Sequence, residues 1–333
     1  MRLKGRPEQT ASFARKTDAL IWAQRVESDV RSGRHFPGNQ ARRRTLGELI
    51  ERYRREVLPE YGPYEQQQRG AKLAWWAERL GSHLLSDLTP AVISEGKAAL
   101  AKGQGLSGRP VSPGTQNRYL GALRHVLGRA HREWEWLGEN PAQRVKSPRE
   151  PRGRARFLSE EERDRLLEVC RTSYDARLYQ QVVVALGTGA RRGELLRLRW
   201  RDIDLSRGTA ILHHTKNNER RTLVLAGRAL AVLRELSAAR RIGTDEVFAG
   251  LDGVARFPRD AWEKALRDAN IVDFRFHDLR HTFASYLAMS GATLAELADA
   301  LGHKTLAMVK RYAHLSEQHT SGVVRRMTER YLA

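Results

Sequence analysis

The sequence lacks the cysteines and long apolar runs that are typical of secreted and membrane proteins. It has one cysteine, Cys170, in 333 residues, which excludes an intrachain disulfide and a zinc site built on several cysteines. No apolar run approaches the roughly 20 residues of a membrane span, and the N-terminus shows no continuous apolar segment of a signal peptide. These absences predict a cytoplasmic protein in which Cys170 is a small core residue.

Acidic residues are outnumbered by basic ones along the whole chain. Lys and Arg total 59 against 39 Asp and Glu, a formal net charge of +20. The excess is +11 over residues 1–150 and +9 over residues 151–333, so it is not confined to one basic tail. This balance predicts a polyanionic partner, most simply nucleic acid. Because 41% of the residues are apolar, the chain can also bury cores.

Helix signals and composition divide the chain into segments. Residues 1–44 hold 11 basic and four acidic residues and predict a basic N-terminal arm with one helix. Residues 45–140 predict a helical unit without strands, whose helices begin at Thr45, Thr89-Pro90 and Ser112-Pro113. Residues 141–156 contain three prolines and six basic residues, which predict an extended basic linker.

The segment after this linker, residues 157–333, mixes helices with two strands. Thr209–His214 and Arg221–Leu225 flank Asn217-Asn218, which predicts a hairpin. Further helices are expected near Pro258–Asp268, Asp278–Ser290, Leu294–Leu301 and Leu306–Ala313. The predicted fold class is mainly α with a small antiparallel β-sheet: a helical domain followed by an α+β domain.

Two motifs imitate well-known sites. The segment Gly187–Gly193 resembles a dinucleotide fingerprint, but Arg192 stands where the third glycine is needed. His277 and His281 are four residues apart, as in a zinc helix, but the Asp between them is shorter than the Glu of that mechanism. We interpret this second motif as a helix with one working and one packed histidine.

Polar motifs at helix starts and turns are informative in their joint order. They are Thr188-Gly189-x-Arg191-x-x-Glu194-Leu195, Thr215-Lys216, His277-x-Leu279-Arg280-His281-Thr282, Leu301-Gly302-His303 and Tyr312. In this order the sequence resembles the tyrosine recombinase (phage integrase) family, strongly over residues 155–320. Residues 45–136 resemble the core-binding domain of that family with less specific signals, and the first 40 residues faintly resemble a shortened arm-binding region.

The resemblance implies DNA strand transfer by the catalytic domain at residues 157–333. Tyr312 would attack a phosphodiester and form a 3′-phosphotyrosyl link. The resemblance implies the other roles as well: phosphate binding by Arg191, Arg280 and His303, proton transfer by His277, protonation of the 5′-oxygen by Lys216, and support of Arg191 by Glu194. The two DNA-facing domains would form a C-shaped clamp around duplex DNA.

The chemistry of these residue types agrees with such a reaction. A free tyrosine has a pKa of about 10, and nearby cations would favour its phenolate. Arginine forks match the two charged oxygens of a phosphodiester, and a leaving alkoxide needs a proton donor. Since protein cations supply the positive charge, no metal or other cofactor is expected, and the sequence has no Walker motif.

The resemblance leaves the biological role open. A phage or mobile-element integrase is favoured by the N-terminal arm, and the alternatives are a chromosome-dimer resolvase and a type IB topoisomerase-like enzyme. A DNA-binding protein without catalysis and a zinc hydrolase are more distant alternatives. Residues 321–333 have apolar spacing that fits packing on their own domain or, by resemblance, docking on a neighbouring protomer of a tetramer on DNA, with accessory bending or directionality factors as further partners.

The cationic reaction centre predicts the result of metal removal. We expect covalent DNA cleavage to continue in excess chelator, because guanidinium and ammonium groups take the place of a Lewis acid. Adduct formation on a nicked duplex, followed on a denaturing gel with and without EDTA, measures this. Complete loss of the adduct that is restored by added magnesium would contradict it.

Overall fold

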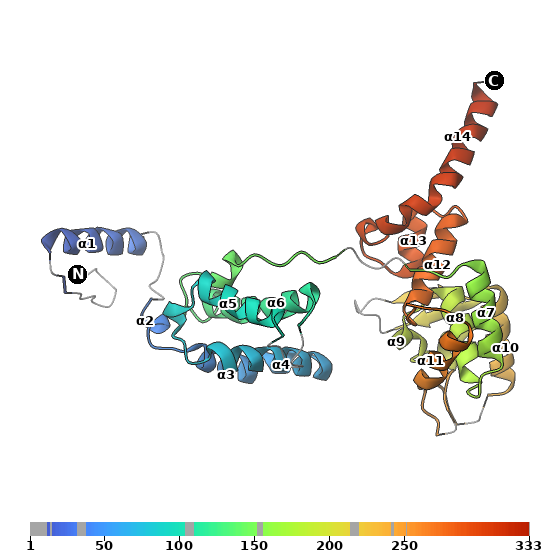
Figure 1. Cartoon of the computed structure of the whole chain (residues 1–333), viewed down its shortest axis with the longest axis horizontal. Helices are drawn as coiled ribbons and strands as arrows, with labels where there is room; N and C mark the ends of the chain where they lie inside the picture. Colours follow the sequence, from blue (N-terminus) through green and yellow to red (C-terminus); the bar gives the residue numbers. More distant parts are fainter. Residues whose placement is uncertain are drawn as a thin grey trace. The chain divides into compact units, whose positions relative to one another are not determined.

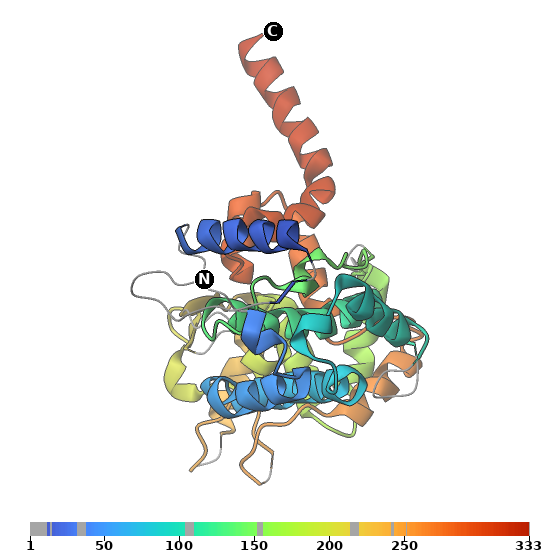
Figure 2. The same ribbon diagram turned by 90° about the vertical axis from the view of Figure 1, so that its left-hand side faces the viewer.

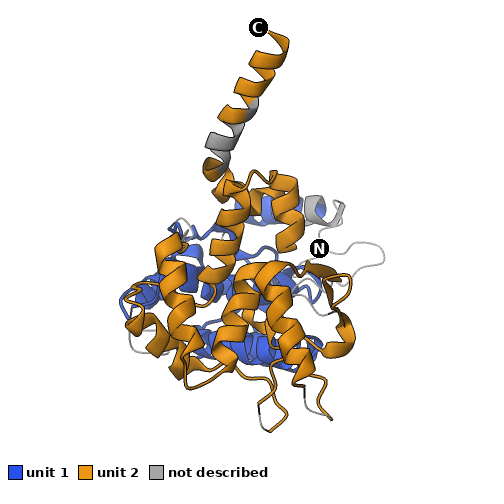
Figure 3. Ribbon diagram, turned by 90° about the vertical axis from the view of Figure 1, so that its right-hand side faces the viewer, with its two compact units in different colours: residues 1–152 blue, residues 153–333 orange. Residues whose placement is uncertain are grey.

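The computed structural model describes residues 12–13, 15–31, 38–103, 110–151, 156–213, 220–240, 243–250 and 252–332. The chain forms two compact units, Met1–Arg152 and Gly153–Ala333, which Figure 3 colours separately. Both are mainly helical, and the sheet of the described ranges lies in the second unit, which confirms the predicted fold class. None of the helices in those ranges combines the length and hydropathy of a membrane span.

Unit 1 consists of helices in its described residues (Figure 1). The α-helices are α1 (Lys16–Arg31), α2 (Gly38–Ala41), α3 (Leu46–Glu56), α4 (Pro63–Leu80), α5 (Pro90–Ala101) and α6 (Pro113–Arg132). Short 3-10 helices join them: η1 (Leu58–Glu60), η2 (Leu85–Asp87) and η3 (Pro141–Arg144). The predicted start signals function as caps, since the side chains of Thr45, Thr89 and Ser112 accept hydrogen bonds from the first turns of α3, α5 and α6.

The core of unit 1 is centred on Trp76, which is fully buried. Its indole N–H donates to the carbonyl of Tyr119 on α6 at 2.9 Å, so its one polar atom is satisfied. Gly96 on α5 lies against the same ring, because a β-carbon at this position would stand 2.6 Å from Cζ3 of Trp76. The absence of a side chain on Gly96 therefore allows α5 to approach the indole.

The start of the predicted linker, residues 141–145, departs from the extended conformation that the sequence predicted. Pro141 begins η3, and Ala142 and Val145 are buried in the core of unit 1. The guanidinium of Arg124 on α6 donates to the carbonyls of Ala142 and Val145. The composition was misleading because the two small apolar side chains, and backbone carbonyls bound by arginine, were enough to pack the segment.

Unit 2 contains the remaining elements. The helices are α7 (Glu160–Arg171), α8 (Arg177–Thr188), α9 (Arg192–Leu195), α10 (Gly227–Ala238), α11 (Arg259–Asp268), α12 (Asp278–Met289), α13 (Leu294–Leu301) and α14 (Glu317–Tyr331). The 3-10 helices are η4 (Trp200–Asp202), η5 (Leu306–Met308) and η6 (Lys310–Ser316), and the strands are β1 (Ile203–Asp204), β2 (Thr209–Leu212) and β3 (Arg221–Val224). The helix α8 is central, since α7, α10 and α12 all pack against it.

The three strands form one antiparallel sheet in the order β1-β2-β3. Thr209 lies opposite Val224 and Leu212 opposite Arg221, so the two predicted strands pair as a hairpin with shorter strands than expected. The predicted Asn217-Asn218 turn lies outside the described residues. The strand β1 and the helix α10 were not predicted, because β1 has only two residues and no alternation to detect.

The C-terminal part of unit 2 contains a second departure from prediction. The expected helix over Leu306–Ala313 is replaced by η5 and η6, which are 3-10 helices. A three-residue repeat places Val309 directly beneath Tyr312, and both side chains are buried. Beyond them α14 extends away from the other helices of unit 2, as the two views in Figure 1 and Figure 2 show.

Cys170 lies on α7 and is fully buried, as expected of a core residue. Burial raises the pKa of its thiol to about 12, because the thiolate would lose its hydration. The side chain therefore packs as a small apolar group.

The contact between Gly96 and Trp76 predicts a stability difference between two glycine substitutions. We expect Gly96→Ala to lower the free energy of unfolding of unit 1 by about 1–3 kcal/mol, because the new methyl group overlaps the buried indole. Gly121→Ala on α6 is the control, since nothing lies within 4 Å of its added carbon, and it should stabilise by about 0.5–1 kcal/mol. Urea denaturation measures both, and equal midpoints would contradict the overlap.

Candidate active site

Arg191 lies at the junction between α8 and α9. The helix α8 ends at Gly189, which has a left-handed conformation with φ of 62°. A β-carbon on Gly189 would also stand 2.4 Å from the ring of Phe283, so this turn requires glycine. The resemblance of this segment to a dinucleotide fingerprint is thereby explained: its glycines end one helix and begin another.

The carboxylate of Glu194 fixes Arg191. It accepts the backbone N–H of Arg191 at 2.9 Å and the guanidinium at 2.6 Å. Glu194 is 3% exposed, and burial would raise its pKa, but its hydrogen bonds and the guanidinium charges leave the pKa below its ordinary value. A buried anion therefore orients the Arg191 fork at the start of α9.

Arg280 is a buried cation that makes three hydrogen bonds within the fold. It lies on α12, is 4% exposed, and donates to the carbonyls of Gly189 at 2.7 Å and Leu301 at 2.5 Å. Burial, followed by repulsion from Arg191 and Arg221, lowers its pKa to about 9. The charged form of Arg280 is therefore destabilised by burial and by the neighbouring arginines, and a bound anion would stabilise it.

His303 follows the C-terminus of α13 and contacts Arg280. The Nη2 of Arg280 donates to Nε2 of His303 at 2.9 Å, and because arginine cannot accept, the proton of the neutral imidazole is on Nδ1. Burial and the surrounding arginines lower the pKa of His303 to about 4, so the ring is neutral. Its buried Nδ1 has no hydrogen-bond partner among the described residues. The site thus contains an N–H donor without an acceptor.

His277 and His281 are neighbours on α12, and their rings meet edge to face at 5.4 Å. Burial is the largest cause that lowers the pKa of each, to about 4 for His281. Across the described ranges no group of three His, Cys, Asp or Glu side chains is arranged to hold a metal ion, and these two histidines have no third ligand there.

Tyr312 is buried on η6 and shares a hydrogen bond of 2.5 Å with Nδ1 of His281. Burial raises the pKa of the phenol, although the charges of Arg311 and Arg280 act in the opposite direction. Nearby cations therefore favour the phenolate, as expected, but desolvation outweighs them, so that the net pKa of the phenol is raised in this conformation. The sequence analysis missed His281, which it interpreted as a packed histidine.

The structure therefore gathers most of the predicted site residues. Each of Arg191, Glu194, His277, Arg280 and His303 interacts directly or electrostatically with another member of this group, and Tyr312 interacts with Arg280. Lys216 lies outside the described residues. We name the gathered group the arginine-histidine site.

Arg221 is a second residue that the sequence analysis missed. It opens β3, is 9% exposed, and donates to the carbonyl of Leu301 and, at 3.4 Å, to Glu194. A signal was present, because Arg221 shares the inward phase of its strand with the buried Leu223. A charge at an inward position normally has a specific partner inside the fold.

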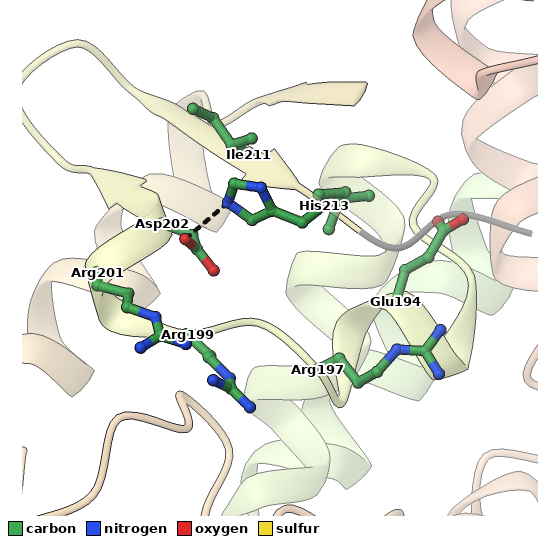
Figure 4. A pocket seen from close by; sticks show the side chains of 8 residues that line it. Glu194, Arg197, Arg199, Arg201, Asp202, Ile211 and His213 are labelled. Carbon is green, nitrogen blue, oxygen red and sulfur yellow. Dashed lines mark hydrogen bonds and ion pairs between the residues drawn. The ribbon is translucent and has the colours of Figure 1, made fainter. Parts of the chain in front are cut away.

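An open cavity of about 450 Å³ lies beside Glu194 (Figure 4). The segment 197–201 forms one wall, with Leu198 and Trp200 buried and the alternate side chains exposed. Those exposed side chains are Arg197, Arg199 and Arg201. His213, at the end of β2, forms another wall and is bonded to Asp202 at 2.9 Å. Cationic surface therefore continues from the arginine-histidine site.

The depressed histidine pKa values predict acid sensitivity of the free protein. The folded pKa of His281 and His303, about 4, lies below the unfolded value of about 6.5, so the unfolded chain binds more protons between these pH values. Stability should be fully present above pH 6.5 and fall as the pH drops towards 4. We expect His281→Asn to weaken this dependence, measured by urea denaturation from pH 7 to 4.5.

His314→Asn serves as the control for this measurement, since His314 is exposed. It should leave the pH dependence of stability as in the unsubstituted protein. An identical slope for His281→Asn and His314→Asn would show that burial of His281 does not contribute.

Comparisons with known proteins identify a family and several relatives of this chain. Residues 156–319 match the phage integrase family. The integrase of Salmonella phage P22 is 34% identical over 229 residues, which cover 63% of this chain and 56% of the relative. Tyrosine recombinase XerC of Xanthomonas axonopodis pv. citri is 30% identical over 215 residues, which cover 61% of this chain and 70% of the relative. The chain spans about half the length of the P22 integrase and of the shufflon-specific DNA recombinase of Escherichia coli.

Solved structures share the fold. The Tn1549 transposon integrase in complex with a circular intermediate DNA has a TM-score of 0.70 at 17% identity, covering 85% of this chain and 99% of that one. A lambda integrase dimer bound to a COC′ core site has a TM-score of 0.64 at 17% identity, covering 79% and 97%. With the family match over 156–319 and a XerC relative covered over 70% of its length, the chain belongs to the phage integrase family of tyrosine recombinases.

Proposed function

We propose that this protein is a site-specific DNA recombinase that cleaves and rejoins DNA through a 3′-phosphotyrosyl intermediate. The observation that carries the proposal is the Nδ1–H of His303, which finds no acceptor in the described part of the chain and lies beside the buried guanidinium of Arg280. Together with Arg191 these groups offer converging donors and excess positive charge, which fit the nonbridging oxygens of a phosphodiester.

In this proposal the residues act in one transfer on phosphorus. The phenol oxygen of Tyr312 forms a bond to phosphorus, and the bond from phosphorus to the 5′-oxygen breaks. Arg191 and Arg280 bind the nonbridging oxygens, and His303 donates to one of them. The Tyr312 phenol gives up its proton as its bond to phosphorus forms, and His277 takes part in this proton transfer. Lys216 protonates the leaving 5′-oxygen, and Glu194 supports Arg191. The covalent phosphodiester is retained throughout, so rejoining is the same exchange in reverse.

The environment of Tyr312 supports its place in this scheme. The phenol is already bonded to an imidazole, that of His281, and interacts with the charge of Arg280. Since the side chain is 3% exposed, attack requires that η6 bring the hydroxyl out of its pocket to the phosphate. A raised pKa keeps the phenol protonated until that step.

The finer role that we propose is integration of phage or mobile-element DNA by a tetramer assembled on two duplexes in the cytoplasm. The similarity to the P22 integrase and to the fold of the Tn1549 transposon integrase supports it. A chromosome-dimer resolvase of the same family is the alternative role. Recombination assays with one and two sites, with and without a DNA-bending factor, distinguish these roles.

Removal of one oxygen atom tests the reaction. We expect Tyr312→Phe to bind DNA as the unsubstituted protein does and to form no covalent adduct, because the ring packs in the same pocket without a nucleophile. The protein is incubated with nicked duplexes whose cores are randomised, denatured and captured, and the attached strands are sequenced. This selection reports the covalent link and identifies a cleaved duplex together.

Tyr174→Phe is the control for this test, since Tyr174 is 72% exposed in the loop between α7 and α8. It should yield the same attached strands as the unsubstituted protein. Recovery of covalent DNA from Tyr312→Phe at an undiminished level would remove Tyr312 from its role.

A further inference from the structure

Arg221 is buried beside the arginine-histidine site and bonded to its Glu194, although the proposed reaction gives it no task. Its Nη1 donates to the carbonyl of Leu301 on α13, and its Nη2 donates to Glu194 on α9 at 3.4 Å. Its Nε is buried and has no hydrogen-bond partner among the described residues. Burial of a guanidinium with an unpaired N–H costs free energy, so the residue needs a reason beyond packing.

Each acceptor of Arg221 also binds an arginine that we assign to the phosphate. The carboxylate of Glu194 accepts from the guanidinium of Arg191 at 2.6 Å. The carbonyl of Leu301 accepts from Arg280 at 2.5 Å. Arg221 therefore stands between the two phosphate-binding side chains and contacts the partner of each.

The fold does not need Arg221 to satisfy these acceptors. Without it, Glu194 would keep its bonds to Arg191, and the carbonyl of Leu301 would keep its bond to Arg280. An apolar side chain of similar volume at the inward position of β3 would match its neighbour Leu223. Such replacements of buried charges are often neutral for stability.

The backbone after Leu301 also packs against the Arg221 side chain. Gly302 has φ of 61°, and a β-carbon on it would stand 2.5 Å from Cδ of Arg221. The turn that leads from α13 to His303 is therefore formed against Arg221. A shift of this side chain would move the carbonyl that holds Arg280 and the backbone that carries His303.

We propose that Arg221 is a positioning residue for the cleavage step. It holds the Glu194 carboxylate and the Leu301 carbonyl at a fixed separation, and thereby sets the spacing of Arg191, Arg280 and His303 around the phosphate. The inference rests on the proposed function, since it assumes that these three groups bind the scissile phosphate. Positioning matters because a displacement of about 1 Å can reduce a rate about 100-fold.

The test compares Arg221→Met with the unsubstituted protein on the duplex identified by the covalent selection. We expect DNA affinity to change by less than about three-fold and the single-turnover rate of adduct formation to fall about 100-fold. Arg207→Met makes the same substitution in the exposed turn between β1 and β2 and should cleave at the unsubstituted rate. An Arg221→Met protein that folds and cleaves at that rate would overturn the proposal.

A second substrate separates positioning from a general structural role. The scissile phosphate is replaced by a methylphosphonate, in which a neutral methyl group stands for one charged oxygen. If Arg221 acts through the groups that bind those oxygens, the loss caused by Arg221→Met should shrink to less than about 10-fold on this substrate. An equal loss on both substrates would show that the substitution damages the site without regard to phosphate charge, and would overturn the proposal.

Arg221→Lys keeps the test decisive if Arg221→Met does not fold. A lysine retains the charge, but its single ammonium group cannot reproduce the fork that joins two acceptors. We expect at least a 10-fold loss of cleavage rate with the same partial recovery on methylphosphonate, and cleavage at the unsubstituted rate would overturn the proposal.

Failure of the proposed function and failure of this inference give different results. If the unsubstituted protein forms no adduct in the selection, the proposed function itself fails, whereas adduct formation unaffected by Arg221 substitutions defeats this inference alone.

Discussion

The arginine-histidine site depends on two guanidiniums that donate to one backbone carbonyl. The carbonyl of Leu301 ends α13, where a helix leaves its last carbonyls without intrahelical partners. Arg280 and Arg221 both bind it, although like charges repel. The arrangement is tolerated because both guanidiniums bind the negative end of the carbonyl dipole and Arg221 also binds the Glu194 carboxylate. The remaining excess of positive charge is the property that suits this part of the molecule to a phosphodiester.

Burial determines how the charge in the site is divided between residue types. The arginines keep their protons even where burial lowers a pKa to about 9, whereas the imidazoles of His281 and His303 are neutral because their pKa values fall to about 4. Neutral imidazoles can accept from one group and donate to another. The guanidiniums therefore provide the positive electrostatic potential of the site, and the neutral histidines provide directed hydrogen bonds within it.

Features with short-range causes were predictable. Helix starts at Thr45, Thr89 and Ser112 depend on a side chain and an N–H three residues away, and each is capped as predicted. Packing of residues 141–145 was not predictable, because it results from Arg124, which lies 18 and 21 residues before the carbonyls that it binds. The 3-10 conformation around Tyr312 was likewise hidden, since apolar spacing of three residues also fits an α-helix.

The sequence by itself determined the helical class, the hairpin and the order of the site motifs, because periodicity, caps and residue chemistry are local properties. Only the tertiary structure decided which groups meet. Arg280 reaches the carbonyl of Gly189 across 91 positions, Arg221 reaches that of Leu301 across 80, and His281 meets Tyr312 across 31. No local pattern encodes such pairs, since they follow from how α12 packs against α8, α13 and η6 in the folded chain.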